Sequence, residues 1–162
     1  MSYDVIDRLP TLDEFTAVTG AVGWRHAYDV DALPVSLARS LHAVVAVHEG
    51  EVVGVGRVIG DGAIYFYLHD IAVLPEHQGR GVGRAIVTAL ERWIATQAGP
   101  RSFVGLFAAG DSMRLYSTFG YRAHPDMTGV FRVGPYQAAG NGGARPKGRA
   151  PSRRGDAGRS PD

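Results

Sequence analysis

Residues 78–83, Gln-Gly-Arg-Gly-Val-Gly, carry three glycines and separate two segments of different periodicity. Before them, residues 65–73 are rich in aromatic and β-branched side chains, the composition of a strand. After them, apolar residues recur at the spacing of an amphipathic helix: Ile86, Ala89, Leu90, Trp93 and Ile94. Gly99 and Pro100 end that helix. The stretch predicts a strand, a glycine turn and a long helix, in that order.

The glycine turn is suited to bind an anion such as a pyrophosphate. Glycine lets the backbone approach a ligand closely, and the first N–H groups of the following helix lack intrahelical acceptors. Two other phosphate-binding patterns do not fit. The only lysine is Lys147, far from any P-loop position, and a G-x-G-x-x-G fingerprint that starts at Gly79 ends on Arg84. A glycine-rich surface turn without a ligand is the alternative.

The turn and its surroundings also match a family pattern. Gln78, Gly81 and Gly83 satisfy Q/R-x-x-G-x-G/A, and Asp-Ile-Ala-Val-Leu-Pro precedes them at residues 70–75. Together these residues closely resemble the acetyl-CoA-binding motif of the GNAT superfamily of N-acetyltransferases. The resemblance implies acetyl-CoA as the cosubstrate and an amine as the acetyl acceptor.

A second stretch, Leu-Tyr-Ser-Thr-Phe-Gly-Tyr at residues 115–121, resembles the Leu-Tyr-x-x-x-Gly-aromatic motif of the same family. The order of expected elements extends the resemblance to about residues 5–133. One position departs from it, because many members carry an asparagine where this chain has Ala109. A polar contact to cofactor or substrate is therefore missing here, or another residue supplies it.

Length and composition are those of a single domain with a charged tail. The chain has 162 residues, a net charge of +1 and no cysteine, which excludes disulfides and thiolate chemistry. We expect an α+β domain over residues 1–136, with a mostly antiparallel sheet splayed around the acetyl-CoA-binding strand, turn and helix. Residues 137–162 hold six Lys or Arg against two Asp and no apolar periodicity, so we expect a disordered tail.

The remaining elements follow from turn residues and periodicity. Thr11 and Glu14 form a capping-box pattern for a helix that Gly20 would end. Further elements are expected at 3–9 (strand), 34–41 (helix), 42–48, 52–59, 63–73 and 102–107 (strands), 112–119 (helix), and 121–123 with 129–133 (a closing hairpin). The strand at 102–107 is expected to be buried and parallel to its neighbour, since a helical crossover precedes it.

The cofactor contacts are expected along one strand edge and the turn. The turn amides would bind the pyrophosphate, with charge-assisted contacts from two arginines. By the resemblance, the pantetheine arm lies along the strand edge, and the Val73 N–H donates to the oxyanion of the tetrahedral intermediate. The expected cofactor-binding residues are Ile71, Ala72, Val73, Gln78, Gly79, Arg80, Gly81, Val82, Gly83 and Arg84.

Two catalytic side chains are predicted. By the resemblance, Tyr116 is the expected general acid for the leaving thiolate, and a phenol suits this role since it stays protonated at neutral pH. His69 is the expected base or water-orienting residue, and strand alternation would place it on one face with Tyr67, Ile71 and Val73. The structural alternatives are a core tyrosine and a half-buried histidine bonded to a carbonyl.

Three residues are predicted to contact the acceptor. Asp70 matches the acidic residue of similar polyamine acetyltransferases; its alternative role is a structural hydrogen bond on the opposite face. By the resemblance, the loop that contains Trp24 closes over the acceptor, so Trp24 is expected in the wall of that pocket, or else as a core aromatic. Tyr67 is expected to point with His69 into that pocket.

The function predicted from these residues is acetyl transfer from acetyl-CoA directly to the amine of a small molecule. The alternatives are a protein or peptide acceptor, or a non-catalytic acyl-CoA-binding module. The near-zero net charge argues against nucleic acid as a partner, the histidines lack metal-ligand spacing, and no apolar run suggests a membrane span. We expect a cytoplasmic protein. Dimers are common among similar proteins, and the sequence leaves the oligomeric state open.

Overall fold

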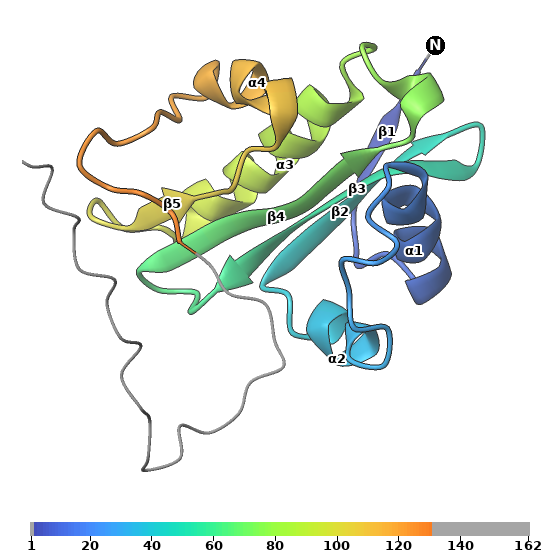
Figure 1. Ribbon diagram of the computed structural model, residues 1–162, viewed down its shortest axis with the longest axis horizontal. Helices are drawn as coiled ribbons and strands as arrows, with labels where there is room; N and C mark the ends of the chain where they lie inside the picture. Colours follow the sequence, from blue (N-terminus) through green and yellow to red (C-terminus); the bar gives the residue numbers. More distant parts are fainter. Residues whose placement is uncertain (1, 131–162) are drawn as a thin grey trace, which may run out of the picture. The chain divides into compact units, whose positions relative to one another are not determined.

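A single sheet in the order β1-β2-β3-β4-β5 forms the centre of the computed structural model, which describes residues 2–130 (Figure 1). The strands are β1 Asp4–Asp7, β2 His42–His48, β3 Glu51–Gly60, β4 Tyr65–Val73 and β5 Phe103–Gly105. Neighbouring strands are antiparallel except β4 and β5, which are parallel. The predicted α+β class with a mostly antiparallel sheet is confirmed.

Helices cover both faces of the sheet. They are α1 Leu12–Ala21, α2 Leu33–Ala38, η1 Pro75–His77, α3 Val82–Gln97, η2 Gly110–Ser112 and α4 Met113–Ser117. In Figure 1, α3 crosses one face, and α1 and α2 lie on the other. Each face has its own hydrophobic core: one contains Ile86 and Leu90 of α3, and the other contains Phe15 of α1 and Leu37 of α2.

Helix α1 begins with the predicted capping box. The Thr11 hydroxyl accepts from the N–H of Glu14, and the Glu14 carboxylate accepts from the N–H of Thr11. A hydrogen bond from the Arg8 guanidinium, 2.7 Å away, lowers the pKa of Glu14 to about 2. The predicted end at Gly20 was wrong by one residue, since the helix continues to Ala21.

Helix α3 packs against β3 at two glycines, Gly54 and Gly56. A side chain at Gly54 or Gly56 would bring its Cβ within 2.9 or 2.5 Å of Ile86, so glycine lets the helix approach the strand closely. The fully buried residues of α3 are Val82, Ile86, Val87, Leu90 and Ile94. Of the predicted inward residues, Ala89 and Trp93 are only partly buried. Trp93 lies at the border of the core, where its ring stacks on His42 at 4.9 Å.

A β-bulge interrupts the pairing of β3 and β4. Val55 pairs with Ala72 and Arg57 with His69, so Gly56 alone faces two residues of β4. One of those two is Asp70, whose φ of 51° lies in the left-handed region that Asp tolerates better than most residues. Because the bulge adds one residue to β4, the side chains after it point to the face opposite to the one that strict alternation would give.

Because of this shift, the predicted placement of His69 and Val73 on one face of β4 is wrong. Before the bulge, Leu68 packs in the α3 core; after it, Val73 does, while Ala72 packs with α1 and α2. His69 pairs with Arg57, whose guanidinium bonds Ser36 and Ser40 on the α2 side of the sheet. His69 and Val73 therefore lie on opposite faces, because an extra residue changes a period of two.

The elements after α3 also differ from the predictions. β5 is shorter than the predicted 102–107, and Phe103 is exposed. Helix α4, Met113–Ser117, is shorter than the predicted helix at 112–119. Residues 121–123 form no strand, because Gly120, at φ 88°, turns the chain and the Tyr121 hydroxyl donates to Glu91 of α3. The predicted tail at 137–162 and the boundary at 136 lie outside the described residues.

Candidate functional site

Strands β4 and β5 pair over only three residues each, 65–67 with 103–105. Beyond this pairing the strands separate, and within residues 2–130 the remaining part of β4 has no strand on its β5 side. Two adjoining pockets lie along this open edge. The turn pocket has a volume of about 620 Å³ and reaches the glycine turn; the His69 pocket has a volume of about 280 Å³.

The turn pocket is built around the start of α3. Its lining comprises Val22, Trp24, Ile71, Ala72, Val73, Gln78, Gly79, Gly81, Gly83, Arg84, Ala109, Ser112, Leu115 and Tyr116. Gly79 and Gly81 have φ values of 71° and 88°, and no atom lies within 4 Å of where their Cβ would be. Glycine is thus required for the path of the backbone, and the space beside it is open.

A side-chain hydrogen bond fixes the position of the turn, and no side chain caps the start of α3. The Gln78 side chain donates to the carbonyl of Val73 at 2.9 Å and so fixes the turn to the end of β4. Helix α3 begins after Gly81 with no side-chain cap, so its first N–H groups have no side-chain acceptor at the N-cap. These amides and the positive end of the α3 dipole fit the pyrophosphate of a coenzyme A ester.

The backbone of Val73 points its N–H into the open edge. The N–H of Leu74 donates to Val53 of β3 at 2.8 Å. Because successive N–H groups of a strand point to opposite sides, that of Val73 points away from β3 and toward the separation from β5. This is the position expected for a donor to a thioester carbonyl placed along β4.

The His69 pocket adjoins the turn pocket. Its lining comprises Trp24, Leu68, His69, Asp70, Ile71, Phe107, Ala109, Ser112 and Tyr116. Tyr116 lines both pockets, and burial raises the pKa of its hydroxyl, which keeps the phenol protonated. Ser112 also lines both, and its buried Oγ has no hydrogen-bond partner among the described residues.

The Asp70 carboxylate contacts three side chains: Arg57, Tyr28 and His69. Its carboxylate accepts from Arg57 Nε at 2.5 Å and from the Tyr28 hydroxyl at 2.9 Å. His69 Nδ1 lies 2.9 Å from Asp70 Oδ1, at ion-pair distance but without hydrogen-bond geometry. Burial alone would raise the pKa of Asp70, but the contacts with His69 and Arg57 outweigh burial and lower it. Asp70 is thus ionised and already partnered by three side chains.

The structure brings most of the predicted site residues together. Trp24 lines both pockets, whereas Tyr67 lines neither and packs against Phe103 with ring centroids 5.7 Å apart. Val82 is buried in the α3 core, and Arg80 is exposed on the turn. Ala109, the position where many family members carry an asparagine, lines both pockets. The pocket residues that the sequence analysis did not predict are Val22, Leu68, Phe107, Ser112 and Leu115. Ser112 could have been found, since it precedes Tyr116 by one helical turn.

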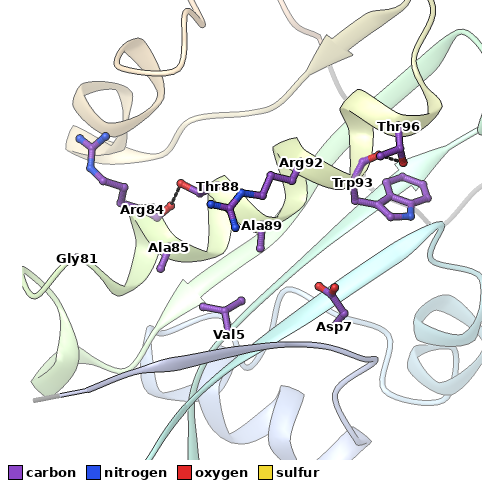
Figure 2. Close-up of a pocket in the computed structure, with 10 residues that line it drawn as sticks. All are labelled: Val5, Asp7, Gly81, Arg84, Ala85, Thr88, Ala89, Arg92, Trp93 and Thr96. Carbon is purple, nitrogen blue, oxygen red and sulfur yellow. Dashed lines mark hydrogen bonds between the residues drawn. The ribbon is translucent and has the colours of Figure 1, made fainter.

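A third hollow, of about 680 Å³, lies between β1 and the outer side of α3 (Figure 2). Arg84, Thr88 and Arg92 line it from the helix, and Asp7 lines it from the strand. It holds neither His69 nor Tyr116. Among residues 2–130, no group of three or more His, Asp or Glu side chains is placed to bind a metal ion. No helix in that part is long and apolar enough to cross a membrane.

Residues 39–123, just over half of the chain, match the model of the acetyltransferase (GNAT) domain family. The chain belongs to this family. It is 31% identical over 84 residues to GCN5-related N-acetyltransferase 2, chloroplastic, of Arabidopsis thaliana, covering 51% of this chain and 32% of that protein. It is 28% identical over 102 residues to histone acetyltransferase TAP1 of Glycine max, covering 59% and 43%. The chain thus matches less than half of the length of these relatives.

Solved structures share the fold over most of the described chain. The structure of SA2161 of meticillin-resistant Staphylococcus aureus has a TM-score of 0.76 at 28% identity and covers 82% of this chain and 99% of that one. The GNAT family protein SP0256 of Streptococcus pneumoniae has a TM-score of 0.68 at 22% identity, covering 83% and 100%. These likenesses show that the fold of this chain is shared with both structures.

Proposed function

We propose that the protein transfers the acetyl group of acetyl-CoA directly to the amine of a small molecule. The observation that carries this proposal is the position of Tyr116, which lines the turn pocket and also shares the His69 pocket with His69. Tyr116 therefore borders both pockets, and His69 lines the smaller one with it. Direct transfer is served by one such group for each reactant, an acid for the leaving thiolate and a base for the amine.

The turn holds the cosubstrate. The amides at the start of α3 bind the pyrophosphate, and the edge of Ile71 to Val73 receives the pantetheine arm in the manner of an added strand. The thioester carbonyl then faces the Val73 N–H, which stabilises negative charge that develops on its oxygen.

His69 and Tyr116 move the two protons. The amine nitrogen forms a bond to the carbonyl carbon, and His69 takes its proton, directly or through water. When the carbon–sulfur bond breaks, Tyr116 donates its phenolic proton to the leaving thiolate. A phenol is protonated at neutral pH, so its O–H can donate to the sulfur as negative charge develops there.

Asp70 acts through His69 in this proposal, in place of the acceptor contact predicted from the sequence. Its carboxylate lies against Nδ1, which favours the tautomer with a proton on Nδ1 and a lone pair on Nε2. Arg57 and Tyr28 hold the carboxylate in place.

The test is acetyl-CoA binding by calorimetry, followed by free-thiol release with small amines and with a lysine-containing peptide. We expect binding, and release that depends on a small amine. Release with the peptide alone would make the protein a peptide acetyltransferase, and binding without release to any acceptor would make it an acyl-CoA-binding module.

A further inference from the structure

We infer that the acceptor is a small arylalkylamine, with one positive charge and one aromatic group, and not a polycation. This inference rests on the proposed function and concerns the His69 pocket alone. It follows from three properties of the pocket lining: two aromatic side chains that make no ring contact with another described residue, a single carboxylate whose charge Arg57 balances, and one group of polar atoms.

Two aromatic side chains of the pocket have no aromatic partner. Phe107 is 68% exposed, and neither it nor Trp24 makes a ring contact with another described residue. They come from different parts of the chain, Trp24 from the loop after α1 and Phe107 from the loop after β5. The pocket also has aliphatic lining from Leu68 and Ile71. Such a lining favours an apolar ring, which can bury its faces against the two aromatic side chains.

The charge of the pocket disfavours a second ammonium group. Among residues 2–130, Asp70 is the only acidic residue in the pocket lining, and its charge is balanced by the buried guanidinium of Arg57. A polyamine or an aminoglycoside would bring several cations that find no free carboxylate. Removing such cations from water without a partner is unfavourable.

The polar atoms of the pocket suit one amine. Ser112 Oγ is buried without a partner among the described residues, and it shares the lining with His69 and Tyr116. An amine nitrogen can donate to Ser112 while His69 receives its proton. The volume of about 280 Å³ is just below the roughly 300–1,000 Å³ of most small-molecule sites, so the acceptor is small.

The experiment compares acceptors at a saturating concentration of acetyl-CoA. The arylalkylamine is 2-phenylethylamine, the matched monocation without an apolar group is ethanolamine, and the polycations are spermidine and kanamycin. We expect kcat/KM for 2-phenylethylamine to exceed that for each of the others by about tenfold or more, the effect of burying one ring. Phe107→Ala should raise KM for 2-phenylethylamine about tenfold, whereas Tyr65→Ala, an exposed aromatic outside both pockets, should not change it.

The outcomes separate this inference from the proposed function. Transfer with a preference for spermidine or kanamycin, or no effect of Phe107→Ala, would overturn the arylalkylamine and leave the proposed function intact. If acetyl-CoA binds but no transfer occurs, the proposed function fails. Calorimetry of 2-phenylethylamine against spermidine, with the wild-type chain and Phe107→Ala, then decides the inference by binding alone.

Discussion

His69 Nδ1 lies 2.9 Å from Asp70 Oδ1, although the two residues are neighbours in one strand and should point to opposite faces. The bulge opposite Gly56 and the left-handed backbone of Asp70 place both side chains on the α2 side of the sheet. A buried carboxylate thus lies against the histidine that lines the His69 pocket.

His69→Ala should lower kcat/KM for acetyl transfer roughly 10²- to 10⁴-fold, the usual contribution of a general base. The ascending limb of the pH–rate profile should disappear with the imidazole, since amine deprotonation then depends on solvent. The measurement is free-thiol release as a function of pH. His124→Ala, an exposed histidine outside both pockets, is the control. An unchanged rate and profile in His69→Ala would remove His69 from the mechanism.

Asp70→Asn should destabilise the fold by about 3–5 kcal/mol, because Arg57 is left buried without a counter-charge. Tyr28→Phe, which keeps the ion pair and removes one donor, should cost about 1–3 kcal/mol. The free energy of unfolding in urea measures both. Asp126→Asn, an exposed aspartate, is the control.

The Asp70 pair also predicts how stability depends on pH. The pKa of Asp70 is lowered in the folded state, so its contribution is present above the unfolded pKa of about 3.9 and is lost as pH falls through the lower folded pKa. The difference in unfolding free energy between wild type and Asp70→Asn should therefore be full at pH 7 and shrink below about pH 4. A difference that grows in acid would contradict the stabilising role of the carboxylate.

Tyr116→Phe should lower kcat by about 10- to 1,000-fold with little change in the KM for acetyl-CoA, because the hydroxyl acts in the transition state. The unfolding free energy should change by no more than about 1 kcal/mol, the value of one hydrogen bond. Tyr121→Phe is the matched control, since its ring lies 6.1 Å from that of Tyr116 and its hydroxyl bonds Glu91 outside both pockets. Full kcat in Tyr116→Phe would show that the Tyr116 hydroxyl takes no part in catalysis and that the residue is structural.

Gly81→Val should abolish acetyl-CoA binding, because a branched side chain at the turn would occupy the space beside the amides. The substitution is also strained at φ 88°, so the control is Gly50→Val, at φ 85° in the β2–β3 turn, where the Cβ also meets no atom within 4 Å. The two variants should lose similar stability in thermal melts. Only Gly81→Val should lose affinity in calorimetry; equal affinity in both would place the anion elsewhere.

Much of the fold and part of the site could be predicted from local sequence. The capping box of Thr11 and Glu14, the turn at 78–83 and the helix after it depend on neighbours within a few residues, so periodicity and glycine positions reveal them. The motif with Tyr116 likewise lies within one short segment.

Tertiary structure decided the rest. The bulge in β4 depends on how Gly56 and Arg57 of β3 pair with it, so alternation within β4 alone put His69 on the wrong side relative to Val73. The partners of Asp70 come from β3 and from the loop before α2, which is why its carboxylate is held by Arg57 and Tyr28. Ser112 and Phe107 join the His69 pocket because β5 leaves β4 after three pairs, and no local pattern shows where two strands separate. Contacts between segments that are distant in sequence set these positions. Such contacts form only when the helices pack on the two faces of the sheet.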